Sequence, residues 1–118
     1  MKYSDMQRVE KIRETTQKLL DYLRSAGITQ EIIMTQEPVR WTITTPLYNI
    51  GEQAYQLSDA FKKQYDHIPW AKISGLRHRL VHDYENTNWK LICAILFEVL
   101  PDFLTSVTAV LQSEESLS

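Results

Sequence analysis

The chain has 118 residues, 43% of them hydrophobic and 24% charged, which is enough to bury one modest core as a single domain. Its one cysteine, Cys93, excludes a disulfide framework and a thiolate metal cluster, and we expect it to be a small core residue. Charged residues interrupt the N-terminal region, and no uninterrupted apolar run reaches about 18 residues. The composition therefore predicts a soluble, cytoplasmic protein without a membrane segment.

The formal charge is −2 and the isoelectric point is near 5.9, which argues against a broad nucleic-acid-binding surface, because such surfaces neutralise phosphates with Lys and Arg. The charge is unevenly distributed, however. Residues 67–90 contain all three histidines and four cationic residues against two carboxylates. The four cations are Lys72, Arg77, Arg79 and Lys90. A local positive excess beside groups that titrate near neutral pH suits a site that handles phosphate.

The pattern of apolar residues in the first half of the chain predicts two long helices. Apolar residues recur at helical spacing over residues 4–26, and Gly27 follows where a glycine commonly ends a helix. A short helical turn or loop is expected over residues 29–36. Residues 38–65 predict a second long helix, which Pro46 must kink or begin. The β-branched run at 41–45 could instead be extended, but a helix is preferred because no partner strand is visible elsewhere.

Two further helices are predicted in the second half. One begins with Pro69 at its first position and runs to Tyr84, and residues 85–88 form a polar break. The last begins at Trp89, and Pro101 either kinks or restarts it. Residues 90–100 are apolar on more than one face, so this helix is either central or meets another subunit. The domain is expected to span residues 1–112, with 113–118 a disordered polar tail.

The helix over 69–84 carries the candidate site. Arg77 shares the apolar face of Leu80 and Val81, where a charge needs a purpose. Structurally, its stem could pack while its head reaches solvent or a carboxylate such as Glu52. Functionally, Arg77 and His82 could flank a groove and bind one phosphate.

A zinc site is a separate possibility on the same helix. His78 and His82 are four residues apart, a spacing at which two imidazoles can bind zinc. The further ligands would have to be Asp83 and Glu85, which lie beside His82 without a second motif. A metal site is therefore not the preferred interpretation.

The ordered set of motifs around this helix resembles the HEPN-domain ribonuclease toxins of the HepT type. The central likeness is Arg77-x-x-x-x-His82-x-Tyr84, with polar His78 directly after the arginine. Three supporting matches accompany it, and they are Gly51-Glu52-x-Ala54, Ile68-Pro69-Trp70 and Leu100-Pro101. The resemblance covers residues 48–107.

The resemblance implies an all-α bundle of four to five helices that forms a symmetric homodimer. It implies a metal-independent endoribonuclease toxin without a cofactor, in which Arg77 and His82 are catalytic and His78 and Arg79 support them. It also implies a nucleotidyltransferase antitoxin that adds AMP to Tyr84. RNA is the implied substrate, and DNA and membranes are not implied partners. Two alternatives stay open: a non-catalytic helical partner of a nucleotidyltransferase, and an unrelated helical bundle.

Overall fold

The computed structural model describes residues 3–81 and 86–117 of the chain. About 85% of the chain is helical, and no described residue belongs to a β-strand, so the predicted all-α class is confirmed. The elements in chain order are α1 (Asp5–Ser25), α2 (Gln30–Thr35), α3 (Glu37–Gln56), α4 (Asp59–Gln64), α5 (Trp70–Val81), α6 (Trp89–Ala94), the π-helical segment η2 (Ile95–Val99) and α7 (Leu100–Leu117).

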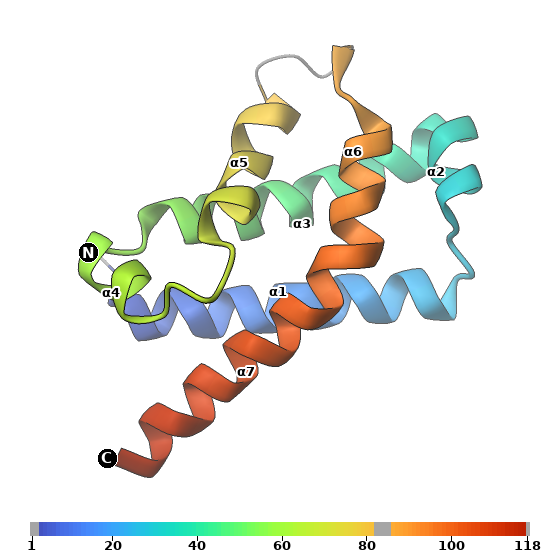
Figure 1. Ribbon diagram of the computed structural model, residues 1–118. Coiled ribbons are helices and arrows are strands. Elements are labelled where there is room, and N and C mark those ends of the chain that lie inside the picture. Colours follow the sequence, from blue (N-terminus) through green and yellow to red (C-terminus); the bar gives the residue numbers. More distant parts are fainter. Residues whose placement is uncertain (1–2, 82–85, 118) are drawn as a thin grey trace.

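The long helices enclose one hydrophobic core. Helices α1 and α3 lie side by side, α5 packs on α3, and the helix that runs from α6 through η2 into α7 crosses α1 (Figure 1). Each long helix contributes fully buried side chains, among them Ile12, Ile50, Ile73, Leu96 and Phe103. Burial of this apolar surface stabilises the bundle. It also fixes α5, the candidate site helix, against α3.

Helix α1 begins and ends where its local sequence predicts. The Ser4 side chain accepts a hydrogen bond from the backbone N–H of Gln7, and the Gln7 side chain accepts one from the backbone N–H of Ser4. This capping box satisfies N–H groups at the start of the helix. At the other end, Gly27 adopts a positive φ of 64°, which a glycine permits at little cost.

Helix α3 is continuous through Pro46, and the helical interpretation of residues 41–45 is confirmed. Its predicted extension to residue 65 is wrong, because α3 ends at Gln56 and a new short helix, α4, begins after Ser58. A distant partner stabilises this break. The Asp5 carboxylate accepts hydrogen bonds from the Ser58 backbone N–H at 2.9 Å and the Ser58 hydroxyl at 2.7 Å, while the same hydroxyl caps α4.

The C-terminal helix accommodates Pro101 without stopping. A proline ring clashes with the carbonyl four residues earlier in a regular α-helix, here that of Phe97. The π-helical segment η2 lies directly before Pro101, and the Leu100 N–H bonds to the carbonyl of Ile95, five residues back. The helix thus passes the proline by widening for one turn.

This helix also continues further than its sequence predicts. It reaches Leu117, whereas the sequence predicts a disordered tail from residue 113. The Tyr65 hydroxyl donates a hydrogen bond of 2.6 Å to the Glu114 carboxylate, which ties the last turns to the segment before α5. Cys93 is buried in the same helix, as expected, and burial raises the pKa of its thiol.

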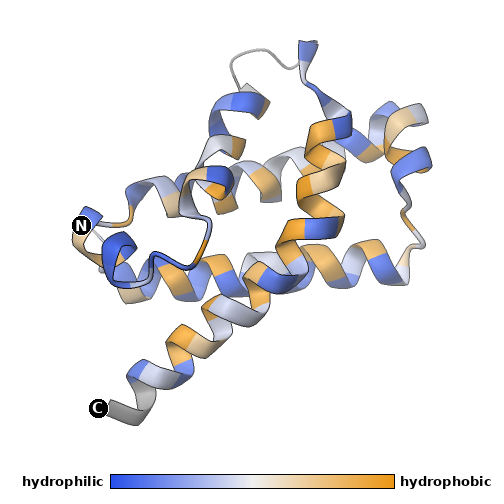
Figure 2. Cartoon of the chain, viewed as in Figure 1, coloured by the Kyte–Doolittle hydropathy of each residue, from blue (hydrophilic) through white to orange (hydrophobic). Residues whose placement is uncertain are grey.

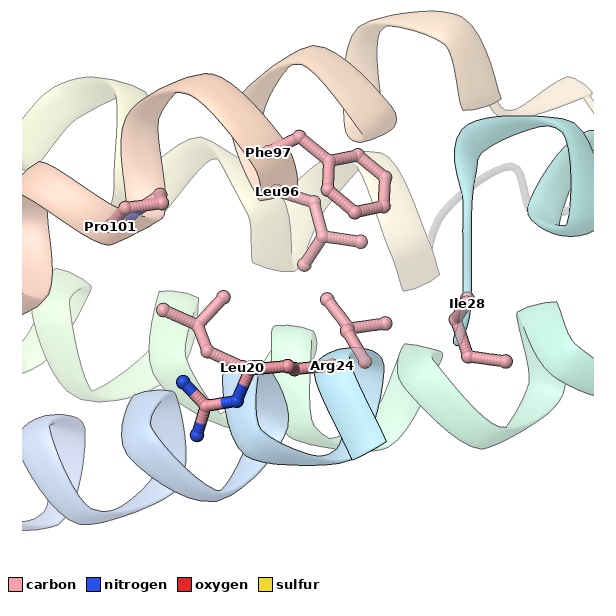
Figure 3. A pocket seen from close by; sticks show the side chains of 7 residues that line it. Leu20, Arg24, Ile28, Leu96, Phe97 and Pro101 are labelled. Carbon is pink, nitrogen blue, oxygen red and sulfur yellow. The ribbon is translucent and has the colours of Figure 1, made fainter. Parts of the chain in front are cut away.

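The stretch from Trp89 to Glu114 is long and apolar enough to cross a membrane by length and composition, although a single such helix is weak evidence for a span. Hydrophobic residues gather along it (Figure 2), and one side packs in the core through Ile92, Leu96 and Leu100. Its other side includes the exposed Phe97 at the rim of an apolar hollow of about 330 Å³ (Figure 3). One side of the helix therefore belongs to the core, as one of the two expectations for residues 90–100 stated, and Phe97 is partly exposed beside it.

Candidate active site on helix α5

Helix α5 begins one residue later than predicted. Its first residue is Trp70, and Pro69 precedes it, with the Pro69 carbonyl accepting a hydrogen bond from the Ile73 N–H at 3.2 Å. The described part of the helix ends at Val81. The predicted site residues Arg77, His78 and Arg79 therefore lie in its last turns, whereas His82 and Tyr84 lie outside the described residues.

Gly51 brings the backbones of α3 and α5 unusually close together. A β-carbon added at Gly51 would lie 2.8 Å from the backbone nitrogen of Arg77, 3.1 Å from the carbonyl oxygen of Ile73 and 3.2 Å from the β-carbon of Leu76. Only glycine fits this contact without moving backbone. Ala54, one turn further along α3, is fully buried. The Gly51-Glu52-x-Ala54 motif thus has a physical role, because its small residues let α5 rest on α3 at the level of Arg77.

Because the two helices are so close, the Arg77 side chain lies against the solvent-facing side of α3. Its Nε donates to a Glu52 carboxylate oxygen at 2.5 Å, and its guanidinium carbon lies 4.2 Å from the ring centroid of Tyr55. About one third of the Arg77 side chain is exposed. The sequence suggested Glu52 as a carboxylate partner of Arg77, and the structure contains this ion pair. The Nε contact takes one of the five N–H donors of the guanidinium, a group that is well suited to bind phosphate.

Glu52 is held in its charged form. The Gln56 amide donates to one of its carboxylate oxygens at 3.1 Å, and Arg77 donates to the other. These two contacts keep the pKa of Glu52 below its ordinary value, although partial burial opposes them. In return, the bond to Glu52 raises the pKa of Arg77, which is charged at all physiological pH values.

The other basic side chains of this region lie on different faces of α5 and α6. His78 and Arg79 are exposed, and so are Lys72 and Lys90. Arg79 and Lys72 line a hollow of about 180 Å³ between α5 and the helix formed by α6 and η2, and Glu98 lines the same hollow. Arg79 is two positions after Arg77, about 200° around the helix. The structure thus places Arg79 on a different face of α5 from Arg77.

Among the described residues, no three His, Cys, Asp or Glu side chains are grouped so that they could hold a metal ion. The zinc alternative depends on His82, Asp83 and Glu85, which lie outside the described residues.

Sequence reasoning missed the aromatic residues around Arg77. Tyr55 stacks on its guanidinium, and Tyr48 lies on the same face of α3 as Tyr55. Both are in α3, seven residues apart, a separation of almost two helical turns. That spacing is visible in the sequence, but only the packing of α5 on α3 shows that Arg77 stacks on Tyr55.

Replacing Glu52 by Gln should lower the stability of the fold modestly and change its pH dependence. A glutamine keeps the side-chain shape but removes the charge, so we expect a decrease in Tm of about 2 to 5 °C at pH 7. Because the pKa of Glu52 is lowered in the fold, the stabilisation is complete above its ordinary value near 4.5 and disappears as the pH falls through the lowered value. The difference in Tm between the two proteins should therefore shrink below pH 4.5. Thermal unfolding followed by circular dichroism from pH 3 to 7 tests this, and a difference that stays constant would contradict it.

Comparison with known proteins shows which family the chain belongs to. The model of the ribonuclease HepT-like family matches residues 7–110, which is most of the chain and includes every motif around α5. The chain belongs to this HepT-like family. The match extends beyond residues 48–107, for which the motifs indicated the resemblance, and reaches back into α1. The resemblance to HepT-type proteins is therefore confirmed, and the alternative of an unrelated helical bundle is excluded.

Individual relatives are distant but cover most of both chains. A protein provisionally named RNase TTE0752 from Caldanaerobacter subterraneus subsp. tengcongensis is 27% identical over 78% of this chain and 82% of its own length. A protein provisionally named RNase MJ1380 from Methanocaldococcus jannaschii is 26% identical over 83% of this chain and 97% of its own length. A protein named probable ribonuclease HepT from Thermococcus cleftensis is 24% identical over 86% of this chain and 90% of its own length. No solved structure matches the chain.

Proposed function

We propose that this protein is the ribonuclease toxin of a toxin–antitoxin pair and that it cuts RNA in the cytoplasm without a metal ion. The observation that carries the proposal is the HepT-like family match over residues 7–110. Within this range, the Arg77 side chain lies partly exposed at the contact between α5 and α3. The ribonuclease names of three relatives support RNA as the substrate class.

Metal-free cleavage uses the ribose 2′-hydroxyl as the nucleophile on the adjacent phosphorus, and it leaves a 2′,3′-cyclic phosphate. The step needs a base for the hydroxyl proton, an acid for the leaving 5′-oxygen and a cation for the phosphate. In a symmetric homodimer that brings the two α5 helices together, one copy of His82 is neutral and acts as base, while the other is protonated and acts as acid. Arg77 binds the scissile phosphate through its planar fork. His78 and Arg79 support the site and the RNA strand, and DNA is not cut because it lacks the 2′-hydroxyl.

The switch in this proposal is Tyr84. A cognate nucleotidyltransferase transfers AMP to its hydroxyl, and the added phosphate then competes with RNA for Arg77 and His82. The intact mass of the protein made together with the transferase should increase by one or more AMP units, and Tyr84→Phe should prevent the increase. An unchanged mass in the presence of an active transferase would contradict this part of the proposal.

The test of the activity itself is cleavage of a labelled single-stranded RNA by the purified, unmodified protein in excess EDTA. We expect fragments that end in a 2′,3′-cyclic phosphate and no cleavage of the all-deoxy strand of the same sequence. Loss of cleavage in EDTA that returns with added metal would overturn the metal-free mechanism.

A second candidate function is that of a non-catalytic helical partner of a nucleotidyltransferase. The observation in its favour is the ion pair between Arg77 and Glu52, which gives Arg77 a structural role without any substrate. This candidate predicts a tight complex with the transferase and no cleavage of any RNA by the unmodified protein.

A further inference from the structure

Three aromatic residues form a stripe along the exposed face of α3. Trp41, Tyr48 and Tyr55 follow one another at intervals of seven residues, so each lies within about 20° of the previous one around the helix. Trp41 is 58% exposed and Tyr55 is 53% exposed, whereas Tyr48 is half-buried. We call these residues the aromatic stripe. Large aromatic side chains exposed in a row are uncommon on a surface without a binding role.

The stripe extends from the candidate site toward the start of α6. At one end, Arg77 stacks on Tyr55 at 4.2 Å. At the other end, the guanidinium of Arg40, next to Trp41 in the chain, lies 5.8 Å from the ring centroid of Trp89. The N-terminal half of α3 therefore lies beside the first turn of α6 (Figure 1). A ligand that enters at Arg77 can follow the stripe along α3.

The charges along the stripe suit a polyanion. Residues 41–51 include no charged side chain, and Glu52, which lies between Tyr48 and Tyr55 in the chain, is paired with Arg77. The other carboxylate of this face, Glu37, lies one turn before Trp41, outside the stripe. Arg40 therefore lies near one end of the stripe and Arg77 near the other. Between these two cations, α3 has no unpaired carboxylate that would repel phosphate. Thr45, which lies between the Trp41 and Tyr48 rings on this face, is polar and exposed, which distinguishes the face from the continuous apolar core of a dimer interface.

We propose that the aromatic stripe binds single-stranded nucleic acid by stacking its bases, with the phosphates directed toward Arg77 and Arg40. Aromatic side chains bind unpaired bases through their faces, whereas the bases of a duplex are already stacked and paired. From Trp41 to Tyr55 the helix rises about 21 Å, the length of roughly six stacked nucleotides at about 3.4 Å each. Only the identification of the strand as RNA rests on the proposed function; the stacking surface itself does not.

Because stacking does not require the 2′-hydroxyl, the binding can be measured on a strand that the proposed reaction cannot cut. The probe is a fluorescent single-stranded 20-mer oligodeoxynucleotide, and the readout is its Kd by anisotropy. Trp41→Ala should weaken binding about tenfold or more, and Trp41→Phe should retain most of it. Met34→Ala is the matched control, because it removes a side chain of similar exposure, 44%, from α2 and should leave the Kd unchanged. An abasic strand of equal length should bind weakly and should not respond to Trp41→Ala.

An unchanged Kd for folded Trp41→Ala would overturn the inference. So would a change from dimer to monomer in sedimentation on the same substitution, because the stripe would then be an interface between copies of this chain. These results are separable from the proposed function. If the protein cuts RNA but Trp41→Ala leaves the Kd unchanged, only the role of the aromatic stripe is refuted. If Trp41→Ala weakens binding but the protein never cuts RNA, only the proposed ribonuclease activity is refuted.

Discussion

Replacing His82 by alanine should abolish RNA cleavage and the growth arrest caused by expression of the protein. Acid–base catalysis by a histidine contributes about 10² to 10⁴ in rate, and one substitution removes both the base and the acid from a symmetric dimer. The measurement is single-turnover cleavage of a labelled single-stranded RNA, with circular dichroism to confirm the fold. His67→Ala is the matched control, because His67 is an exposed imidazole of the same region that is not part of the motif. Full cleavage by a folded His82→Ala protein would refute the mechanism.

Arg77 needs a more careful substitution, because it has a structural partner. Arg77→Ala should also abolish cleavage, but it leaves Glu52 without the guanidinium that accompanies it in the fold. Arg77→Lys keeps the charge and loses the planar fork, so we expect the fold to persist while cleavage decreases by at least about tenfold. If Arg77→Lys cleaved at the rate of the unsubstituted protein, the role of Arg77 in binding the scissile phosphate would be wrong.

Replacing Gly51 by alanine should lower the stability of the protein although it adds only one methyl group. The new β-carbon would lie 2.8 Å from the Arg77 backbone nitrogen, and because that contact is with backbone, α5 itself must move. Overpacking costs about 1 to 3 kcal/mol, which exceeds the gain of up to about 1 kcal/mol from the helix propensity of alanine. We expect a net loss of about 1 to 2 kcal/mol in the free energy of unfolding. Urea denaturation measures it.

Gly75 provides the matched control for this substitution. It lies inside α5, and a β-carbon there would approach only the Arg79 side chain, at 4.0 Å. Gly75→Ala should therefore stabilise the protein by about 0.5 to 1 kcal/mol. A Gly51→Ala protein that is as stable as Gly75→Ala would show that the close approach of α3 and α5 does not matter. If the shift of α5 occurs as expected, Gly51→Ala should also reduce cleavage, because it displaces Arg77 without changing any residue of the Arg77–His82 pair.

The pairing of Arg77 with Glu52 links these predictions. The sequence is compatible with two roles for Arg77: a packed arginine with a carboxylate partner, and a phosphate ligand. The structure contains the first, and the geometry permits the second as well, because the side chain stays one-third exposed beside Tyr55. An ion pair that orients a guanidinium at a surface prepares it for phosphate. The Glu52→Gln protein, in which this orientation weakens, should accordingly cleave more slowly than its small loss of stability alone would cause.

The sequence by itself determined the all-α class, the boundaries of α1 and the family motifs around α5. These features depend on neighbours within a few residues: the Ser4 and Gln7 capping box, the glycine after α1, and the helical periodicity of apolar residues. Tertiary structure alone decided where α3 ends, because Ser58 is held by Asp5 from the far end of the chain. It also decided what Arg77 contacts, since Glu52 and Tyr55 reach it only because Gly51 lets two helices meet at backbone distance. A local pattern specifies which face of a helix is apolar, but the partner that covers this face is selected by the packing of the whole bundle.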